Sequence, residues 1–183
     1  VHALVRAENV TTGLARLRAN MSDYDLWQPE YAHEITVLCG DLESEHFGLT
    51  AEAYSAAARD CDLLIHNGAC VNFGQPIEDL LPCNVGGTRR AVELAAKGSM
   101  RLCHVSSLSV FSLHHFVGDA STRRPDPRIL INGYSRSKWL GEQLVWAAGD
   151  CGLPVTVVRP GRIMGDSTTG AANLKDWFAC YLK

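Results

Sequence analysis

Short apolar runs alternate along this chain with longer segments whose apolar residues have helical spacing. The runs are rich in Val, Ile and Leu, which is typical of strands covered on both faces of a sheet. They occupy residues 2–6, 35–40, 62–68, 101–107 and 154–161. The intervening segments predict helices over 8–20, 51–59, 77–97, 134–149 and 171–183.

This alternation predicts parallel strands joined by right-handed crossovers in a doubly wound α/β fold. Ligands of such folds bind at the carboxyl ends of the strands. Polar and glycine-containing segments follow four of the runs, and we expect them to share one crevice. They are "GD" at 40–41, "HNGA" at 66–69, "SSLSV" at 106–110 and "RPGRIMG" at 159–165.

Composition describes one globular domain or a large part of one. The 183 residues are 46% hydrophobic and carry a net charge of -3, with seventeen basic residues scattered among twenty acidic ones. This balance argues against a nucleic-acid surface. The chain has no stretch of 18 apolar residues and no signal-peptide pattern at its start, so we expect a cytoplasmic protein with no membrane partner.

The cysteines and histidines predict neither a disulfide framework nor a metal site. Seven cysteines form no Cys-x-x-Cys pair, which favours reduced and mostly buried thiols. His114 and His115 are adjacent, so their side chains diverge, and no further ligand stands nearby at metal-binding spacing.

Tyr134 and Lys138 stand one helical turn apart, in "GYSRSKWLGEQLV" at 133–145. Residues four apart share a helix face, so both side chains can enter the crevice, where the ammonium is expected to lower the pKa of the phenol. Hydroxyl groups in "HVSSLSVF" end the strand before this helix and could bind a carbonyl oxygen. The alternative is that Tyr134 packs its ring, Lys138 extends into water, and the serines merely cap the strand.

Several longer stretches resemble one family. "HNGACVN" at 66–72, "NVGGTRRAVELA" at 84–95, "GYSRSKWLGEQLV" and "RPGRIMGDSTTG" at 159–170 are similar to the extended short-chain dehydrogenase/reductases. Within that superfamily the chain most resembles the thioester reductase domains of nonribosomal peptide synthetases, some polyketide synthases and carboxylic acid reductases. The resemblance implies a Rossmann fold over residues 1–183.

The resemblance also assigns roles to individual residues. It makes Tyr134 the general acid, Lys138 the partner that lowers its pKa and holds the nicotinamide ribose, and Ser107 the group that binds the carbonyl oxygen, where many relatives have Thr. Arg6 stands where an NAD-specific enzyme carries an acid, which points to NADPH. The other cofactor contacts that it implies are Arg16 at the 2′-phosphate, Asp41 and Leu42 beside the adenine, Asn67, Gly68 and Ala69 along the pyrophosphate and ribose, and Pro160 and Ile163 beside the nicotinamide.

A glycine-rich turn that binds pyrophosphate normally follows the first strand of a dinucleotide fold, and none is present here. We therefore interpret residues 1–183 as a partial domain that lacks the first strand, that glycine-rich loop and the C-terminal substrate-binding region.

The function implied by the resemblance is NADPH-dependent reductive release of an acyl or peptidyl chain. The chain would be held as a thioester on a carrier-protein phosphopantetheine arm, with adenylation and carrier domains on the same polypeptide. The product would be an aldehyde or, after a second reduction, an alcohol. The alternatives are a nucleotide-sugar epimerase or dehydratase, a fatty acyl-CoA reductase and an NADP-sensing regulatory module.

Overall fold

A computed structural model describes residues 1–111 and 121–174. His114, His115, Cys180 and the greater part of the predicted helix 171–183 lie outside the described residues. The chain divides into two compact units, Val1–Cys39 with Arg162–Lys183 and Gly40–Gly161.

The first unit contains a two-stranded parallel sheet. Strand β1 (His2–Val5) pairs with β2 (Thr36–Cys39), with His2 opposite Thr36, and helices α1 (Val10–Ser22) and α2 (Tyr31–Glu34) lie between them in sequence. Helix α1 begins at Asn9 because the Asn9 side chain accepts from the Thr12 amide while Thr12 Oγ1 accepts from the Asn9 amide. A Cβ atom at Gly13 would lie 2.6 Å from Val37, so glycine permits the close approach of α1 to β2.

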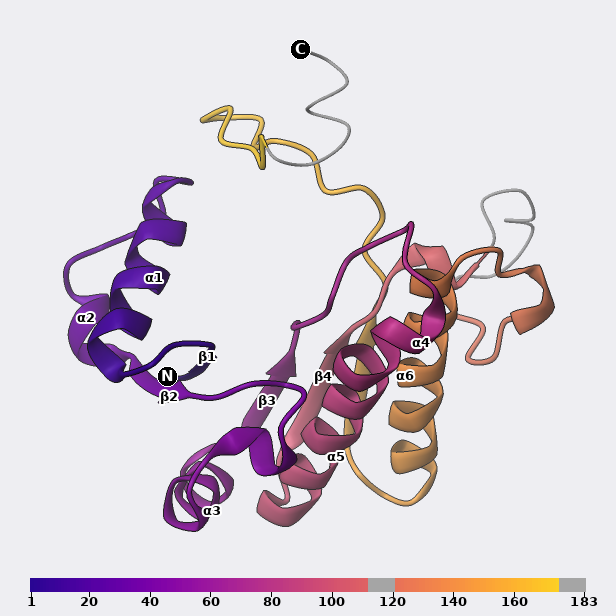
Figure 1. Cartoon of the computed structure of the whole chain (residues 1–183), viewed down its shortest axis with the longest axis horizontal. Helices are drawn as coiled ribbons and strands as arrows, with labels where there is room; N and C mark the ends of the chain where they lie inside the picture. Colours follow the sequence, from indigo (N-terminus) through magenta and orange to yellow (C-terminus); the bar gives the residue numbers. More distant parts are fainter. Residues whose placement is uncertain (112–120, 175–183) are drawn as a thin grey trace. The chain divides into compact units, whose positions relative to one another are not determined.

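The second unit is built on a three-stranded parallel sheet in the order β3–β4–β5, of which β3 and β4 are labelled in Figure 1. Its strands are β3 (Leu63–His66), β4 (Arg101–Val105) and β5 (Val155–Val158), and its longer helices are α3 (Ala51–Asp60), α5 (Gly87–Gly98) and α6 (Gly133–Asp150). The predicted alternation and parallel pairing are confirmed in both units. The short elements are α4 (Ile77–Leu80), a π-helical segment (Leu81–Gly86) and single 3₁₀ turns at Glu45–Gly48, Leu108–Val110 and Pro127–Ile129.

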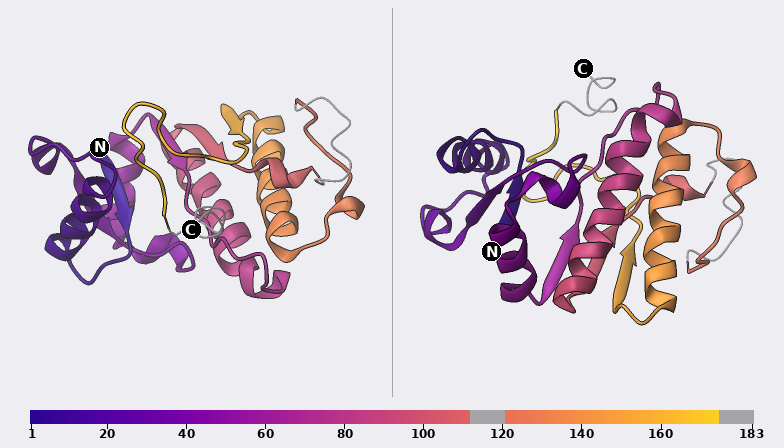
Figure 2. Two further views of the ribbon diagram at one scale, coloured as in Figure 1. Left: turned by 90° about the horizontal axis from the view of Figure 1, so that it is seen from above. Right: turned by 60° about the horizontal axis from the view of Figure 1, so that its bottom comes forward.

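Helices α3, α5 and α6 cover one face of this sheet, and α5 and α6 run side by side (Figure 2). Their apolar residues enclose Leu102, which is 1% exposed, whereas Ile65 on the opposite face is 63% exposed. Within this unit the described helices cover the face that carries Leu102. Leu63, Ile65 and Val158 are exposed apolar residues of the other face, as the continuous apolar runs of a two-sided sheet predict.

The single helix predicted over 77–97 is three successive elements. Helix α4 passes through the π-helical segment into α5, and Pro82 lies at the start of that segment. Proline has no amide hydrogen to donate, so the regular bonding pattern is interrupted there. The wider turn carries Asn84, which is 3% exposed.

None of the helices in the described part of the chain is both long and apolar enough to cross a membrane.

Candidate active site

Tyr134 lies in the first turn of α6, which begins where Asn132 caps it by accepting from the Ser135 amide at 2.8 Å. A Cβ atom at Gly133 would lie 2.6 Å from the Gln75 carbonyl oxygen, so the helix can start here only with glycine. The Tyr134 ring is 8% exposed and meets Phe73 edge-on at 4.9 Å. Sequence reasoning did not single out Gly133, although it immediately precedes the tyrosine.

Ser107 follows the carboxyl end of β4, and its side chain lies close enough to the Tyr134 phenol to affect its pKa. The same Ser107 oxygen accepts from the Ser109 amide at 3.1 Å, so it also caps the short 3₁₀ turn. Burial raises the pKa of Tyr134 above its ordinary value, and the nearby Ser107 hydroxyl opposes this shift. The direction is opposite to the lowered pKa expected from the sequence, because desolvation of the phenol is the largest effect.

Lys138 is buried at the same end of β4, with 4% of its surface exposed. Its ammonium donates to the Val105 carbonyl oxygen at 2.8 Å. Burial lowers the pKa of Lys138 to about 8, while Glu142, one helical turn onward, and Cys83 oppose the shift. The alternative in which Lys138 extends into water is therefore wrong.

Two buried histidines, which were not identified from the sequence, lie near enough to Lys138 for its charge to affect their pKa values. His66 and His104 occupy paired positions on β3 and β4, with ring centroids 5.3 Å apart. Burial first and the Lys138 charge second lower the pKa of His66 to about 4 and that of His104 to about 2. Both rings are therefore neutral at physiological pH and add no positive charge beneath Lys138.

Asn84 connects the segment after Ala69 to α6. Its side-chain oxygen accepts from the Cys70 amide at 2.7 Å, and its amide nitrogen donates to the Cys70 carbonyl at 3.0 Å and to Ser137 Oγ at 2.9 Å. Three such bonds on a buried amide leave little freedom for the 69–70 segment. In the sequence, the only indication of this role is that Asn84 is a polar residue within the predicted helix 77–97.

A buried ion pair holds the segment that follows β5. Arg159 Nε donates to Glu142 Oε2 at 3.0 Å, and the Arg159 guanidinium also donates to the Thr122 carbonyl and lies over the Phe111 ring. The next residue, Pro160, accepts from the Leu108 amide at 3.0 Å. Pro160 is thereby fixed to the 3₁₀ turn that Ser107 caps.

The segment after β3 is in contact with the segment containing Asp41 and Leu42. A Cβ atom at Gly68 would lie 2.6 Å from Leu42 Cδ1, so a larger residue would displace the leucine. Asn67 is exposed and Ala69 is half-buried on either side of this contact. The second unit thus brings Leu42 to Gly68 and, separately, Tyr134 to Ser107.

Three of the predicted cofactor residues, Arg6, Arg16 and Ile163, belong to the first unit. Arg16 donates to the Arg6 carbonyl oxygen at 2.8 Å, and Ile163 is 81% exposed. The two arginines border a hollow of about 430 Å³, which is lined by Leu4, Val5, Arg6, Arg16, Leu17, Asn20 and Asp23. Among the residues that the structure describes, no three His, Cys, Asp or Glu side chains are grouped to hold a metal ion.

Comparison with known proteins places these features in a family context. Residues 1–183 match the family NAD_binding_4, described as male sterility protein. A linear gramicidin synthase subunit of Brevibacillus parabrevis is 39% identical over 181 residues, and the L-2-aminoadipate reductase large subunit of Candida glabrata is 35% identical over 198 residues. The crystal structure of the terminal R domain from the myxalamid PKS-NRPS biosynthetic pathway superposes with a TM-score of 0.89 at 38% identity.

These matches cover nearly all of the chain but only part of each relative. The gramicidin synthase match covers 96% of this chain and 4% of the relative, and the aminoadipate reductase match covers 100% and 14%. The R-domain structure match covers 100% of this chain and 47% of that chain. The chain therefore spans less than half the length of each.

The low pKa of Lys138 predicts a pH-dependent contribution to stability. In the unfolded chain Lys138 keeps its proton up to its ordinary pKa of 10.5, whereas in the folded protein it releases the proton near pH 8. The free-energy cost of burying the charged ammonium is therefore full below pH 8. This cost disappears as the pH rises toward 10.5. Relative to Lys138→Met, the wild-type free energy of unfolding should therefore increase by about 2 kcal/mol between about pH 7.5 and pH 10.

Urea unfolding at both pH values measures this difference. Lys97→Met, at an exposed position on α5, is the matched control for the substitution itself. A Lys138→Met difference that does not change with pH would contradict the low pKa.

Proposed function

Because the chain belongs to the NAD-binding family described as male sterility protein, within the extended short-chain dehydrogenase/reductases, we propose that residues 1–183 form the cofactor-binding part of an NADPH-dependent thioester reductase. The family binds a nicotinamide cofactor. The observation that supports the reductase proposal most is that Ser107, Tyr134 and the Lys138 ammonium come together at the carboxyl end of β4.

The residues present fit a dinucleotide in both units. In the second unit Gly68, which lies against Leu42, leaves the middle of the 67–69 segment without a side chain. A backbone segment without a side chain allows the close approach that a pyrophosphate requires. In the first unit Arg6 and Arg16 border one hollow and can pair with a 2′-phosphate. The residues proposed to hold NADPH are Arg6, Arg16, Asp41, Leu42, Asn67, Gly68, Ala69, Tyr134, Lys138, Pro160 and Ile163.

NADPH would supply a hydride to the carbonyl carbon of the thioester. Ser107 and Tyr134 would donate hydrogen bonds to the carbonyl oxygen and stabilise its developing negative charge. The phenol of Tyr134 is protonated at neutral pH, so it can transfer that proton to the oxygen as negative charge develops there. The hemithioacetal then breaks its carbon–sulfur bond, which gives an aldehyde and a free thiol.

Lys138 has two roles in this proposal. Its ammonium is fixed on the Val105 carbonyl, so it can place positive charge beside the reacting oxygen and donate to the nicotinamide ribose hydroxyls. With a pKa of about 8, it can also exchange a proton near neutral pH and so restore the proton that Tyr134 gives up.

The substrate proposed is an acyl or peptidyl thioester on the phosphopantetheine arm of a carrier protein. Similarity to a linear gramicidin synthase subunit and to a terminal R domain of a PKS-NRPS pathway supports this. The terminal position of that R domain fits a step that releases a finished chain. Adenylation and carrier domains on the same polypeptide are part of the proposal.

Substrate class is the decisive prediction. The longest natural polypeptide that contains residues 1–183 should oxidise NADPH when given an acyl pantetheine thioester, faster when the thioester is on its own carrier protein. The aldehyde or alcohol released is measured by mass spectrometry. Conversion of a nucleotide sugar, with all thioesters left intact, would replace the reductase proposal with the epimerase or dehydratase alternative.

Tyr134→Phe should lose about 100-fold or more in turnover while it still binds NADPH, because only the proton donor is removed. Tyr54→Phe is the matched control, since Tyr54 is 7% exposed in the core of the same unit and should keep full turnover. Turnover and NADPH affinity are measured by absorbance and by fluorescence titration. A fully active Tyr134→Phe enzyme would restrict this tyrosine to packing, and a protein that binds NADPH without any turnover would favour the regulatory-module alternative.

Arg6→Ser should weaken NADPH binding about tenfold or more and leave NADH binding unchanged, because a charge-assisted bond to the 2′-phosphate is removed. The control is Arg18→Ser, which replaces an exposed arginine of α1 that does not line the hollow. Titration with both cofactors measures the preference. Equal affinity of the wild-type protein for NADPH and NADH would remove the role given to Arg6.

A further inference from the structure

Residues 41–48, here called the 41–48 turn, have an unusual backbone. His46, Phe47 and Gly48 have φ values of 49°, 60° and 70°, three successive residues in the left-handed region. That conformation is unfavourable for His and Phe, so other contacts must hold it. The turn closes on itself where the Asp41 amide donates to the Phe47 carbonyl at 2.9 Å, and the Phe47 side chain is buried in the core.

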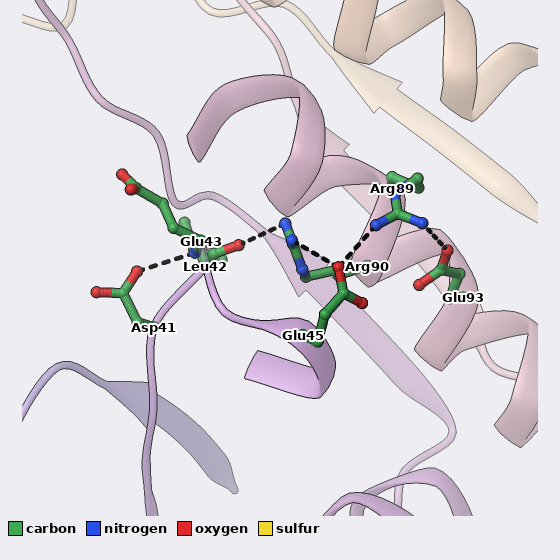
Figure 3. Close-up of polar contacts among 7 residues, drawn as sticks. All are labelled: Asp41, Leu42, Glu43, Glu45, Arg89, Arg90 and Glu93. Carbon is green, nitrogen blue, oxygen red and sulfur yellow. Dashed lines mark hydrogen bonds and ion pairs between the residues drawn. The ribbon is translucent and has the colours of Figure 1, made fainter. Parts of the chain in front are cut away.

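Arg90 of α5 holds the turn from outside (Figure 3). Its guanidinium donates to the Leu42 carbonyl oxygen at 3.2 Å and to Glu45 Oε1 at 2.9 Å. The Arg90 side chain is only 10% exposed. Arg90 therefore attaches the turn to α5 at two points of the turn, the Leu42 backbone oxygen and the Glu45 side chain.

Arg89 provides a natural comparison, because it also reaches Glu45 Oε1, at 3.0 Å. Its side chain is 51% exposed, and its other bond is to Glu93 on its own helix. Arg89 therefore holds the side chain of Glu45 and not the Leu42 backbone. Surface ion pairs of this kind contribute little to stability.

Leu42 transmits this anchoring to the segment after β3. Besides its contact with Gly68, Leu42 packs on α5, where a Cβ atom at Gly87 would lie 3.1 Å from Leu42 Cβ. A shift of the Leu42 backbone would therefore also disturb the backbone of 67–69. Arg90 thus binds one of the segments proposed to contact the adenosine half of the cofactor, and Leu42 of that segment lies against the other.

We propose that Arg90 is a positioning residue for the adenosine half of the dinucleotide, which acts by fixing Leu42 against Gly68. The inference rests on the proposed function, because it takes Asp41 and Leu42 as the residues beside the adenine. Arg90 does not itself contact the cofactor in this proposal.

Two cofactors distinguish positioning from general destabilisation. Arg90→Gln should weaken NADPH binding about tenfold and leave turnover at saturating NADPH within about twofold of wild type. Reduced nicotinamide mononucleotide lacks the adenosine half, so its kcat/KM should not change. Arg90→Lys keeps the charge but cannot reach both acceptors with one planar fork, so it should give a smaller loss and serves if the Gln variant does not fold.

The matched control is Arg89→Gln, which should bind NADPH as the wild type does. All variants are made in the longest natural polypeptide that contains residues 1–183. NADPH affinity unchanged by either Arg90 substitution overturns the inference, as does an equal loss with both cofactors. If the wild-type protein binds NADPH but reduces no thioester, the proposed function is wrong, and the NADPH titrations still decide the role of Arg90. If the wild-type protein does not bind NADPH, both the proposed function and the role of Arg90 are wrong.

Discussion

The buried ammonium of Lys138 is the constraint around which the second unit is arranged. A charge removed from water is tolerated only where polar groups replace its solvation. Here the Val105 carbonyl accepts from it, and Glu142 lies one turn along the same helix. His66 and His104 complete the surroundings as neutral rings, because burial first and the Lys138 charge second disfavour their protonation.

Buried polar residues on helices also fix the loops of this unit. Asn84 holds Cys70, Glu142 holds Arg159 and with it Pro160, and Arg90 holds Leu42. Glu142 and Arg90 are carried by helices that pack on the sheet, α6 and α5, and Asn84 by the π-helical segment that packs on both of these helices. The loops proposed to bind cofactor therefore depend on the same core that supports the strands, as positions for a reaction must.

Much of this could be predicted from the sequence. The apolar runs located the five strands of the described residues, and helical spacing located α1, α3, α5 and α6, because strand and helix periodicities are local properties of the chain. The resemblance selected Ser107 and Tyr134, which the structure brings close together. The break of the 77–97 helix was not predicted, although Pro82 was a local signal for it.

What the sequence determined alone was the order and type of the elements, together with the residue types available at the strand ends. Burial was decided only by the tertiary structure, and with it the directions of the pKa shifts of Tyr134, Lys138 and the two histidines. Desolvation depends on which groups far apart in sequence surround a side chain, and no spacing rule contains that information. For the same reason the anchoring roles of Asn84, Arg90 and Glu142 became visible only once helices α5 and α6 were packed against the strand-end loops.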